Sequence, residues 1–179
     1  MHYAELSSPL YHGSDISFTK IDLSYSSPKK DYGSGFYTTN EKAQAEKFAR
    51  LKARRSRAPK GYVESFNLQD CEGLSIKKFN LADNEWFDYV LFNRGFGGLV
   101  NMPSCDTFDI VIGPVANDAV GLVLNQFVAG TFGDPMGAEA KATAIRLLLA
   151  QKLHNQIFFG TERAVLRLDF CEVSDVCLD

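Results

Sequence analysis

The order of strand-like and helix-like segments is the feature that most restricts the fold of this 179-residue chain. Short apolar or alternating runs, which favour strands, occupy residues 10–14, 35–37, 62–67, 74–79, 108–115, 156–160 and 168–176. Helical periodicity occupies residues 39–57, 85–94, 117–129 and 138–153, with a short helical turn at 162–168. Because the strands do not alternate regularly with helices, the pattern predicts an α+β fold rather than a doubly wound sheet. We find no internal repeat or linker, so we predict one domain over residues 1–179.

The stretch GFYTTNEKAQAEKF joins a strand that ends on Tyr37 to the first of these helices. Thr38 and Glu41 have the spacing of a capping box, which predicts a helix from Thr39 to Arg57 that stops before Pro59.

Apolar spacing on this helix places Ala45, Phe48 and Leu51 on one face. That face can bring the Phe48 ring back beside Tyr37 and leave a slot between the two rings. The alternative is that both rings are ordinary core residues.

Two later helices carry apolar stripes that predict buried faces. Trp86, Phe87, Val90 and Leu91 form the first stripe, and Ala144, Leu147, Leu148 and Gln151 form the second. Asn117 or Asp118 is expected to cap the helix between them.

Composition narrows the functional classes. The net charge of −3 argues against a dedicated nucleic-acid binder, which is usually basic. No run approaches the roughly 18 apolar residues of a membrane span, and the first residues lack the basic and apolar regions of a signal peptide. The four cysteines show no CxxC spacing or histidine cluster, so we expect reduced thiols, a cytoplasmic protein and no metal site.

Four ordered motifs point to a known superfamily. LYHGS contains His12 and a glycine that permits close approach of a ligand; GFYTT follows, with Phe48 eleven residues after Tyr37, and NQIFFGT lies near the C-terminus. Together they resemble the ADP-ribosyltransferase superfamily, in the diphtheria-toxin-like and poly(ADP-ribose) polymerase branch with a His, Tyr, Glu signature. Through GFYTT, EKAQAEKFA, DIVIGPVAND and NQIFF, most of the chain is also similar to a small, largely uncharacterised prokaryotic family grouped with that superfamily.

The resemblance implies a split antiparallel β-sheet core with flanking helices, and NAD as co-substrate. His12 would bind the adenosine-side ribose, and the Gly13 backbone would pair with the nicotinamide carboxamide. Tyr37 and Phe48 would hold the nicotinamide ring between them, and Ser14 would join the binding residues. Offset stacking of this kind is worth about 0.5–1.5 kcal/mol per aromatic pair.

At one position the chain departs from the superfamily pattern. Gln156 stands where a catalytic Glu usually binds the nicotinamide-ribose 2′-OH, and Glu162 lies about 20 Å further along an extended strand, too far to replace it. A unit charge 4 Å from a developing cation is worth about 4 kcal/mol at an effective dielectric near 20, or about three decades in rate. Gln156 is therefore expected to act as a neutral acceptor.

Three functions are compatible with these residues: a mono-ADP-ribosyltransferase, a module that binds NAD or ADP-ribose without catalysis, and an NAD glycohydrolase. The resemblance also suggests a toxin neutralised by a small antitoxin-like partner. The acceptor, protein or nucleic acid, carries no readable code in residues 22–34 or 130–137. A basic run of Arg50, Lys52, Arg54, Arg55, Arg57 and Lys60 is either a solvated helix end or a contact for phosphates or an acidic partner.

Overall fold

Two β-sheets form the centre of the protein. The structure is a computed structural model that describes residues 4–100, 107–114, 118–149 and 153–178. In the described residues, a three-stranded sheet has the order β1-β3-β7 and a four-stranded sheet the order β2-β6-β5-β4. The first sheet contains β1 (Leu10–Ser14), β3 (Gly61–Leu68) and β7 (Leu168–Val176). The second contains β2 (Phe36–Thr38), β4 (Ile76–Lys78), β5 (Ile110–Pro114) and β6 (Asn155–Phe159).

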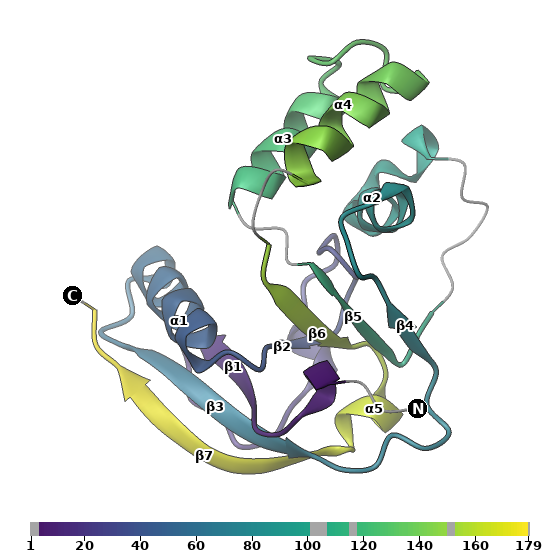
Figure 1. Ribbon diagram of the computed structural model, residues 1–179. Helices are drawn as coiled ribbons and strands as arrows, with labels where there is room; N and C mark the ends of the chain where they lie inside the picture. Colours follow the sequence, from purple (N-terminus) through teal and green to yellow (C-terminus); the bar gives the residue numbers. More distant parts are fainter. Residues whose placement is uncertain (1–3, 101–106, 115–117, 150–152, 179) are drawn as a thin grey trace.

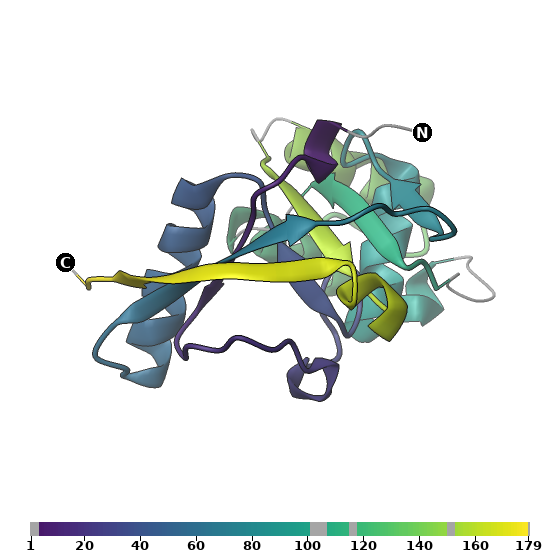
Figure 2. The ribbon, with the colours of Figure 1, turned by 90° about the horizontal axis from the view of Figure 1, so that it is seen from below.

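Helices cover the two sheets from opposite ends of the molecule (Figure 1). The described helices are α1 (Lys42–Ser56), α2 (Asn84–Leu91), α3 (Asp118–Val128), α4 (Ala138–Leu149) and the single turn α5 (Glu162–Val165). α1 packs on β1 and β3, whereas α2, α3 and α4 lie at the end of the four-stranded sheet; the view from below shows the same separation (Figure 2). The predicted α+β class is confirmed.

Strand pairing is mostly antiparallel, as expected, but not entirely. β1, β3 and β7 pair antiparallel, and so do β2, β6 and β5. β4, however, runs parallel to β5, because the chain crosses from one to the other through α2 and the turns that follow it. The four-stranded sheet is therefore mixed and not wholly antiparallel.

The start of α1 differs from the predicted capping box. Thr38 belongs to β2, where its hydroxyl donates to the Ile157 carbonyl at 3.2 Å and cannot cap a helix. Thr39 bends the chain instead: its Oγ1 accepts from the Glu41 N–H at 3.1 Å. The helix begins only at Lys42, with no side-chain cap from Glu41. Its end matches the prediction, because Arg57 takes a left-handed conformation two residues before Pro59.

The buried face of α1 is a stripe of small residues rather than the predicted Ala45–Phe48–Leu51 face. Ala45, Ala49 and Ala53 are buried, whereas 48% of Phe48 is exposed. Small side chains allow the helix to approach β1 and β3 closely. A Cβ atom added to Gly13 of β1 would lie 2.2 Å from the Ala45 carbonyl oxygen.

The later helices follow the predicted apolar stripes with two exceptions. Trp86, Phe87, Val90 and Leu91 are all buried, as are Ala144 and Leu148. Leu147, in contrast, is 40% exposed, because it lies beside the stripe that meets α3. In the described residues α4 runs to Leu149, and Leu153, the predicted last residue of the helix, is not helical; Gln151, Asn117 and the side chain of Asp118 lie outside the described residues.

The four-stranded sheet separates two large apolar clusters. Phe36, Ile110, Ile112, Ile157 and Phe159 face the three-stranded sheet. On the other face, Val111 and Phe158 pack against the helices with Trp86 and Phe127. Tyr37 is paired with Phe158, and Gln156 lies two residues before Phe158 on β6. Because side chains alternate along a strand, Tyr37 and Gln156 point to the same face as Phe158, the face that the helices cover.

The close contact between Gly13 and α1 gives a test of the fold. We expect Gly13→Ala to lower the free energy of unfolding by about 3 kcal/mol, because the new methyl group meets backbone atoms that cannot rotate away. Gly121→Ala is the matched control: Gly121 lies in α3 with no atom within 4 Å of an added Cβ, so it should gain about 0.5–1 kcal/mol. Urea unfolding measures both changes, and equal effects would contradict the close packing.

Candidate functional site

The motif strands β1 and β2 meet where the two sheets join. Tyr11 and Thr39 exchange both backbone hydrogen bonds, at 2.7 and 2.9 Å, in an isolated bridge. Peptide groups alternate in direction along a strand, so the N–H and C=O of Gly13 also face β2. At that level no second bridge forms; instead, the His12 imidazole Nδ1 lies 2.6 Å from the Tyr37 carbonyl oxygen. The strands are thus linked by a side chain, and the Gly13 peptide faces the space beyond the bridge.

This contact decides which ring nitrogen of His12 carries the hydrogen. A carbonyl oxygen only accepts, so Nδ1 carries the hydrogen and Nε2 is left as an acceptor. The ring stacks on Phe36, with centroids 4.6 Å apart, and meets the edge of Phe18. Burial, reinforced by the positive charge of Lys52, lowers the pKa of His12 to about 3. The imidazole is therefore neutral throughout the physiological range.

Neighbouring residues hold both the hydroxyl and the ring of Tyr37 in place. Its hydroxyl donates to the Gly33 carbonyl at 2.7 Å and accepts from the Tyr32 N–H at 3.1 Å. Its ring packs against Phe158 and Tyr32, and the Lys30 ammonium lies 5.2 Å from the ring centroid. Burial raises the pKa of the phenol, so Tyr37 provides a fixed aromatic face and not a proton.

Phe48 provides a second aromatic face on α1. The Lys52 ammonium lies 5.3 Å from its centroid, one helical turn away. Among the described residues, the rings of Tyr37 and Phe48 make no direct contact; each ring carries a lysine instead. Gly13 is close to both α1 and β2, because a Cβ added to it would meet the backbone of Ala45 and Ala49 in α1 while its peptide faces β2.

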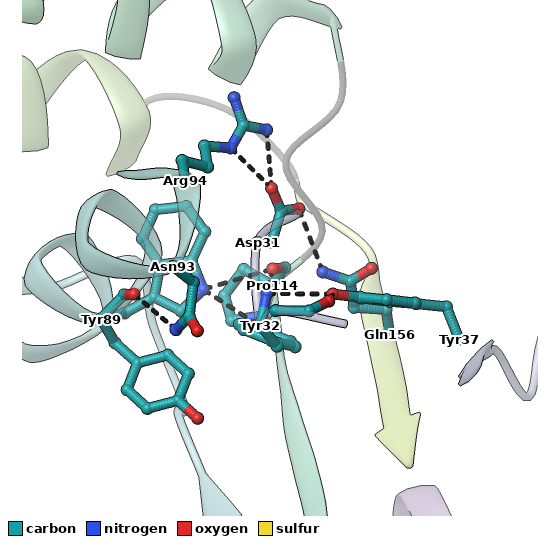
Figure 3. A network of polar contacts seen from close by, with 10 residues as sticks. Asp31, Tyr32, Tyr37, Tyr89, Asn93, Arg94, Pro114 and Gln156 are labelled. Atoms are coloured by element: carbon teal, nitrogen blue, oxygen red, sulfur yellow. Dashed lines mark hydrogen bonds and ion pairs between the residues drawn. The ribbon is translucent and has the colours of Figure 1, made fainter. Parts of the chain in front are cut away.

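Gln156 lies in a buried polar network with a carboxylate that sequence reasoning missed (Figure 3). Its Nε2 donates to Asp31 Oδ2 at 3.2 Å, and Arg94 binds Asp31 Oδ1 through Nε at 2.9 Å and a terminal nitrogen at 2.6 Å. Asp31 and Gln156 are each only 7% exposed. Because a carboxylate only accepts, the amide must turn its nitrogen to Asp31 and its oxygen away from it.

Asp31 lies in the loop between β1 and β2, where no motif or periodicity marks it. Arg94 forms an ion pair with Asp31, although the two residues are 63 positions apart in sequence. Figure 3 shows Asp31 between Arg94 and Gln156, with Tyr32 and Tyr37 beneath. The arrangement joins Tyr37 and Gln156 in one network, while His12 reaches it through the Tyr37 backbone.

Glu64 is a second carboxylate that sequence reasoning missed. It is opposite His12 in the β1–β3 register, is fully buried, and neither of its side-chain oxygens has a hydrogen-bond partner among the described residues. Burial raises its pKa to about 7, although nearby backbone N–H groups and Lys52 favour the charged form. An unsatisfied buried carboxylate costs stability when it ionises.

The remaining predicted residues have simpler surroundings. Ser14 is buried at the end of β1, where its Oγ accepts from the Ile16 N–H at 3.3 Å. In the basic run, Arg50 pairs with Glu46 and Lys60 with Asp175, as in an ordinary solvated helix end. Lys52 differs, because it points toward Phe48 and the site.

Comparison with known proteins places the chain in a family. Residues 9–170 match the family described as protein of unknown function (DUF3990). The chain belongs to this family. The match runs from β1 into β7, so the DUF3990 region includes every strand and helix that contributes to the site. No curated protein and no solved structure shows significant similarity to it. No helix in the described part of the chain combines the length and apolar character that crossing a membrane requires.

The unpaired carboxylate of Glu64 predicts an unusual pH dependence of stability. Its folded pKa of about 7 lies above the ordinary value of 4.5, so the folded state binds more protons and loses stability as pH rises between these values. Between pH 5 and pH 8 this loss is about 2–3 kcal/mol. We expect Glu64→Gln to remove it in urea unfolding at both pH values. Glu72→Gln, at an exposed turn, should retain the wild-type slope, and a wild-type slope in Glu64→Gln would contradict the burial argument.

Proposed function

We propose that the protein is an NAD-dependent mono-ADP-ribosyltransferase that transfers ADP-ribose to a macromolecular acceptor, with the site between β1, β2, β6 and α1. The observation that carries the proposal is the interrupted pairing of β1 and β2. The Gly13 peptide faces the open side of a strand edge, and a carboxamide has the donor and the acceptor needed to pair with it.

The surrounding side chains support NAD as the ligand. His12 presents a neutral imidazole whose Nε2 can accept from a ribose hydroxyl. Tyr37 and Phe48 already hold cations on their faces, so the same faces suit the positively charged pyridinium ring of NAD. These proposed roles are the ones that the resemblance to the ADP-ribosyltransferase superfamily implies.

In the proposed reaction, the bond between C1′ of the ribose and the nicotinamide nitrogen breaks, and nicotinamide leaves with the electron pair. The acceptor forms the new bond to C1′ and releases its proton to solvent. Gln156 accepts a hydrogen bond from the 2′-OH through its amide oxygen, which Asp31 orients by binding the amide nitrogen. Arg94 neutralises most of the Asp31 charge at 2.6 Å, so Asp31 positions Gln156 and does not replace the missing carboxylate.

A non-catalytic NAD- or ADP-ribose-binding module is the second candidate. The neutral Gln156 and the neutralised Asp31–Arg94 pair favour it, because neither supplies a free negative charge to an oxocarbenium-like ribose. An NAD glycohydrolase would use the same residues with water as acceptor. Inhibition by a small antitoxin-like protein would accompany the transferase if it acts as a toxin.

The first test separates these functions in one assay. Purified protein is incubated with NAD labelled in the adenosine half and a cell extract as acceptor, and free nicotinamide and labelled macromolecule are measured separately. We expect both products in equal amounts. Nicotinamide without label would indicate the glycohydrolase, and binding of NAD without either product the binding module.

Phe48→Ala tests the aromatic face in the same assay. Phe48 is 48% exposed, so its loss should leave stability nearly unchanged, while the KM for NAD should rise about tenfold, since cation–π and stacking contacts are each worth about 1 kcal/mol. Leu122→Ala, 58% exposed on α3, is the matched control and should leave KM unchanged. An unaltered KM in Phe48→Ala would remove Phe48 from the site.

A charge exchange tests the roles of Asp31 and Gln156. Gln156→Glu alone places two carboxylates about 3 Å apart and should raise the pKa of one of them. The double variant Asp31→Asn, Gln156→Glu keeps the number of negative charges but moves the charge from the carboxylate that Arg94 contacts to position 156, beside the ribose of the proposed complex. We expect the double variant to fold normally and to release nicotinamide faster, by up to about three decades. Slower release in a folded double variant would contradict the role given to Gln156.

A further inference from the structure

Two lysines from distant segments converge on the candidate site. Lys30 comes from the loop between β1 and β2, and Lys52 from α1, yet each lies over one of the two site aromatics, at 5.2 and 5.3 Å from the ring centroids. The two ammonium groups are close enough for Lys30 to disfavour the charged form of Lys52, and both act on His12. The ribose-binding imidazole of the proposed site therefore lies within the field of both cations.

Neither lysine is neutralised by a direct ion pair. Within the described residues, no carboxylate oxygen lies within 4 Å of either ammonium; the Lys30 Nζ donates only to Ser26 Oγ, at 3.4 Å. Glu64 and Asp15 act on Lys52 from a distance, and Glu64 forms no hydrogen bond. Burial lowers the pKa of both lysines. Two half-buried cations without a contacting anion make a site of positive potential that favours an anionic ligand.

The positions of the lysines indicate which anion fits. Both lie on ring faces that the pyridinium would take in the proposed function, so a pyridinium and the ammonium groups compete for the same surfaces. A ligand that carries a cationic ring and two phosphates satisfies both requirements together: the ring takes the aromatic faces, and the displaced ammonium groups gain phosphate oxygens. Charge-assisted contacts of that kind are stronger than the cation–π contacts they replace.

We propose that Lys30 and Lys52 form the pyrophosphate-binding part of the site, and that they rest on Tyr37 and Phe48 until a dinucleotide displaces them. The identity of the ligand rests on the proposed function; the anion site itself rests on the positions of the two lysines. The flexible four-carbon stem of lysine permits this movement without a change in the backbone.

The experiment uses two probes that each carry half of the ligand's chemistry. ADP-ribose has both phosphates but no cationic ring, and 1-methylnicotinamide, methylated on the ring nitrogen, has the cationic ring but no phosphate. Calorimetric titrations of the wild type, Lys30→Gln, Lys52→Gln and the double variant give the affinity for each probe. Lys47→Gln, an exposed lysine on the same helix with no aromatic contact, is the control.

The two probes should respond in opposite directions. We expect each single variant to weaken ADP-ribose binding about tenfold, and to bind 1-methylnicotinamide several-fold more tightly because a competing cation is gone. A lysine with a merely structural role would move both affinities the same way or neither. ADP-ribose affinity in the double variant equal to the wild type, or no binding of ADP-ribose by the wild type, overturns the proposal.

The test also separates this proposal from the proposed function. If ADP-ribose binding depends on the lysines but NAD yields neither nicotinamide nor labelled macromolecule, the result supports the anion site and contradicts the transferase function. If NAD is turned over and the lysine variants bind ADP-ribose as tightly as the wild type does, the result supports the transferase function and contradicts the pyrophosphate site. Inorganic pyrophosphate as a third probe distinguishes the sources of the anion: binding equal to that of ADP-ribose would show a general phosphate site and overturn a dinucleotide site.

Discussion

The contact between Gly13 and α1 is the constraint on which the site depends. Since the glycine has no side chain, the helix lies directly on β1, and the residues flanking its alanine stripe reach the edge of that strand. β2 precedes α1 by only a few residues, so the same contact holds β2 near β1 without completing the pairing between them. His12 then occupies the first position where pairing would continue. A larger residue at position 13 would move α1, and with it Phe48 and Lys52.

Two buried carboxylates show how differently this fold treats negative charge. Asp109, 1% exposed, accepts from Arg163, Thr161 and Ser75, and these hydrogen bonds hold its pKa well below its usual range. Glu64 is equally buried and has no such donors. Asp109 is thus a structural anchor that ties β5 to the neighbouring segments, whereas ionised Glu64 carries a desolvation cost that nearby backbone N–H groups and Lys52 offset only in part. Its place opposite His12 puts that cost in the candidate site.

The sequence predicted those parts of the fold that depend on local apolar pattern. The strands around His12 and Gln156 and the buried stripe of α2 follow from periodicity, because burial there is decided by neighbours in sequence. The start of α1 was wrong, since Thr38 serves the sheet, and a capping pattern cannot reveal that competing use. The exposure of Phe48 was missed because alanine at every fourth position outweighs a single ring when a helix must pack against Gly13. Asp31 could not be found at all: its partners are tertiary, and its loop has no period.

The charged side chains around the site indicate which ligand would match its charge. Among the described residues, Lys30, Lys52 and Arg94 outnumber Asp31, and Glu64 is only partly ionised near neutral pH, so these residues give the site an excess of positive charge. NAD brings one positive ring and two negative phosphates, a net negative charge that offsets part of this excess. A ligand with the ring alone would add to it, and one with phosphates alone would draw the lysines to itself without covering the aromatic faces. In the proposed function, the complete dinucleotide is therefore the ligand that best matches both the charge and the shape of the site.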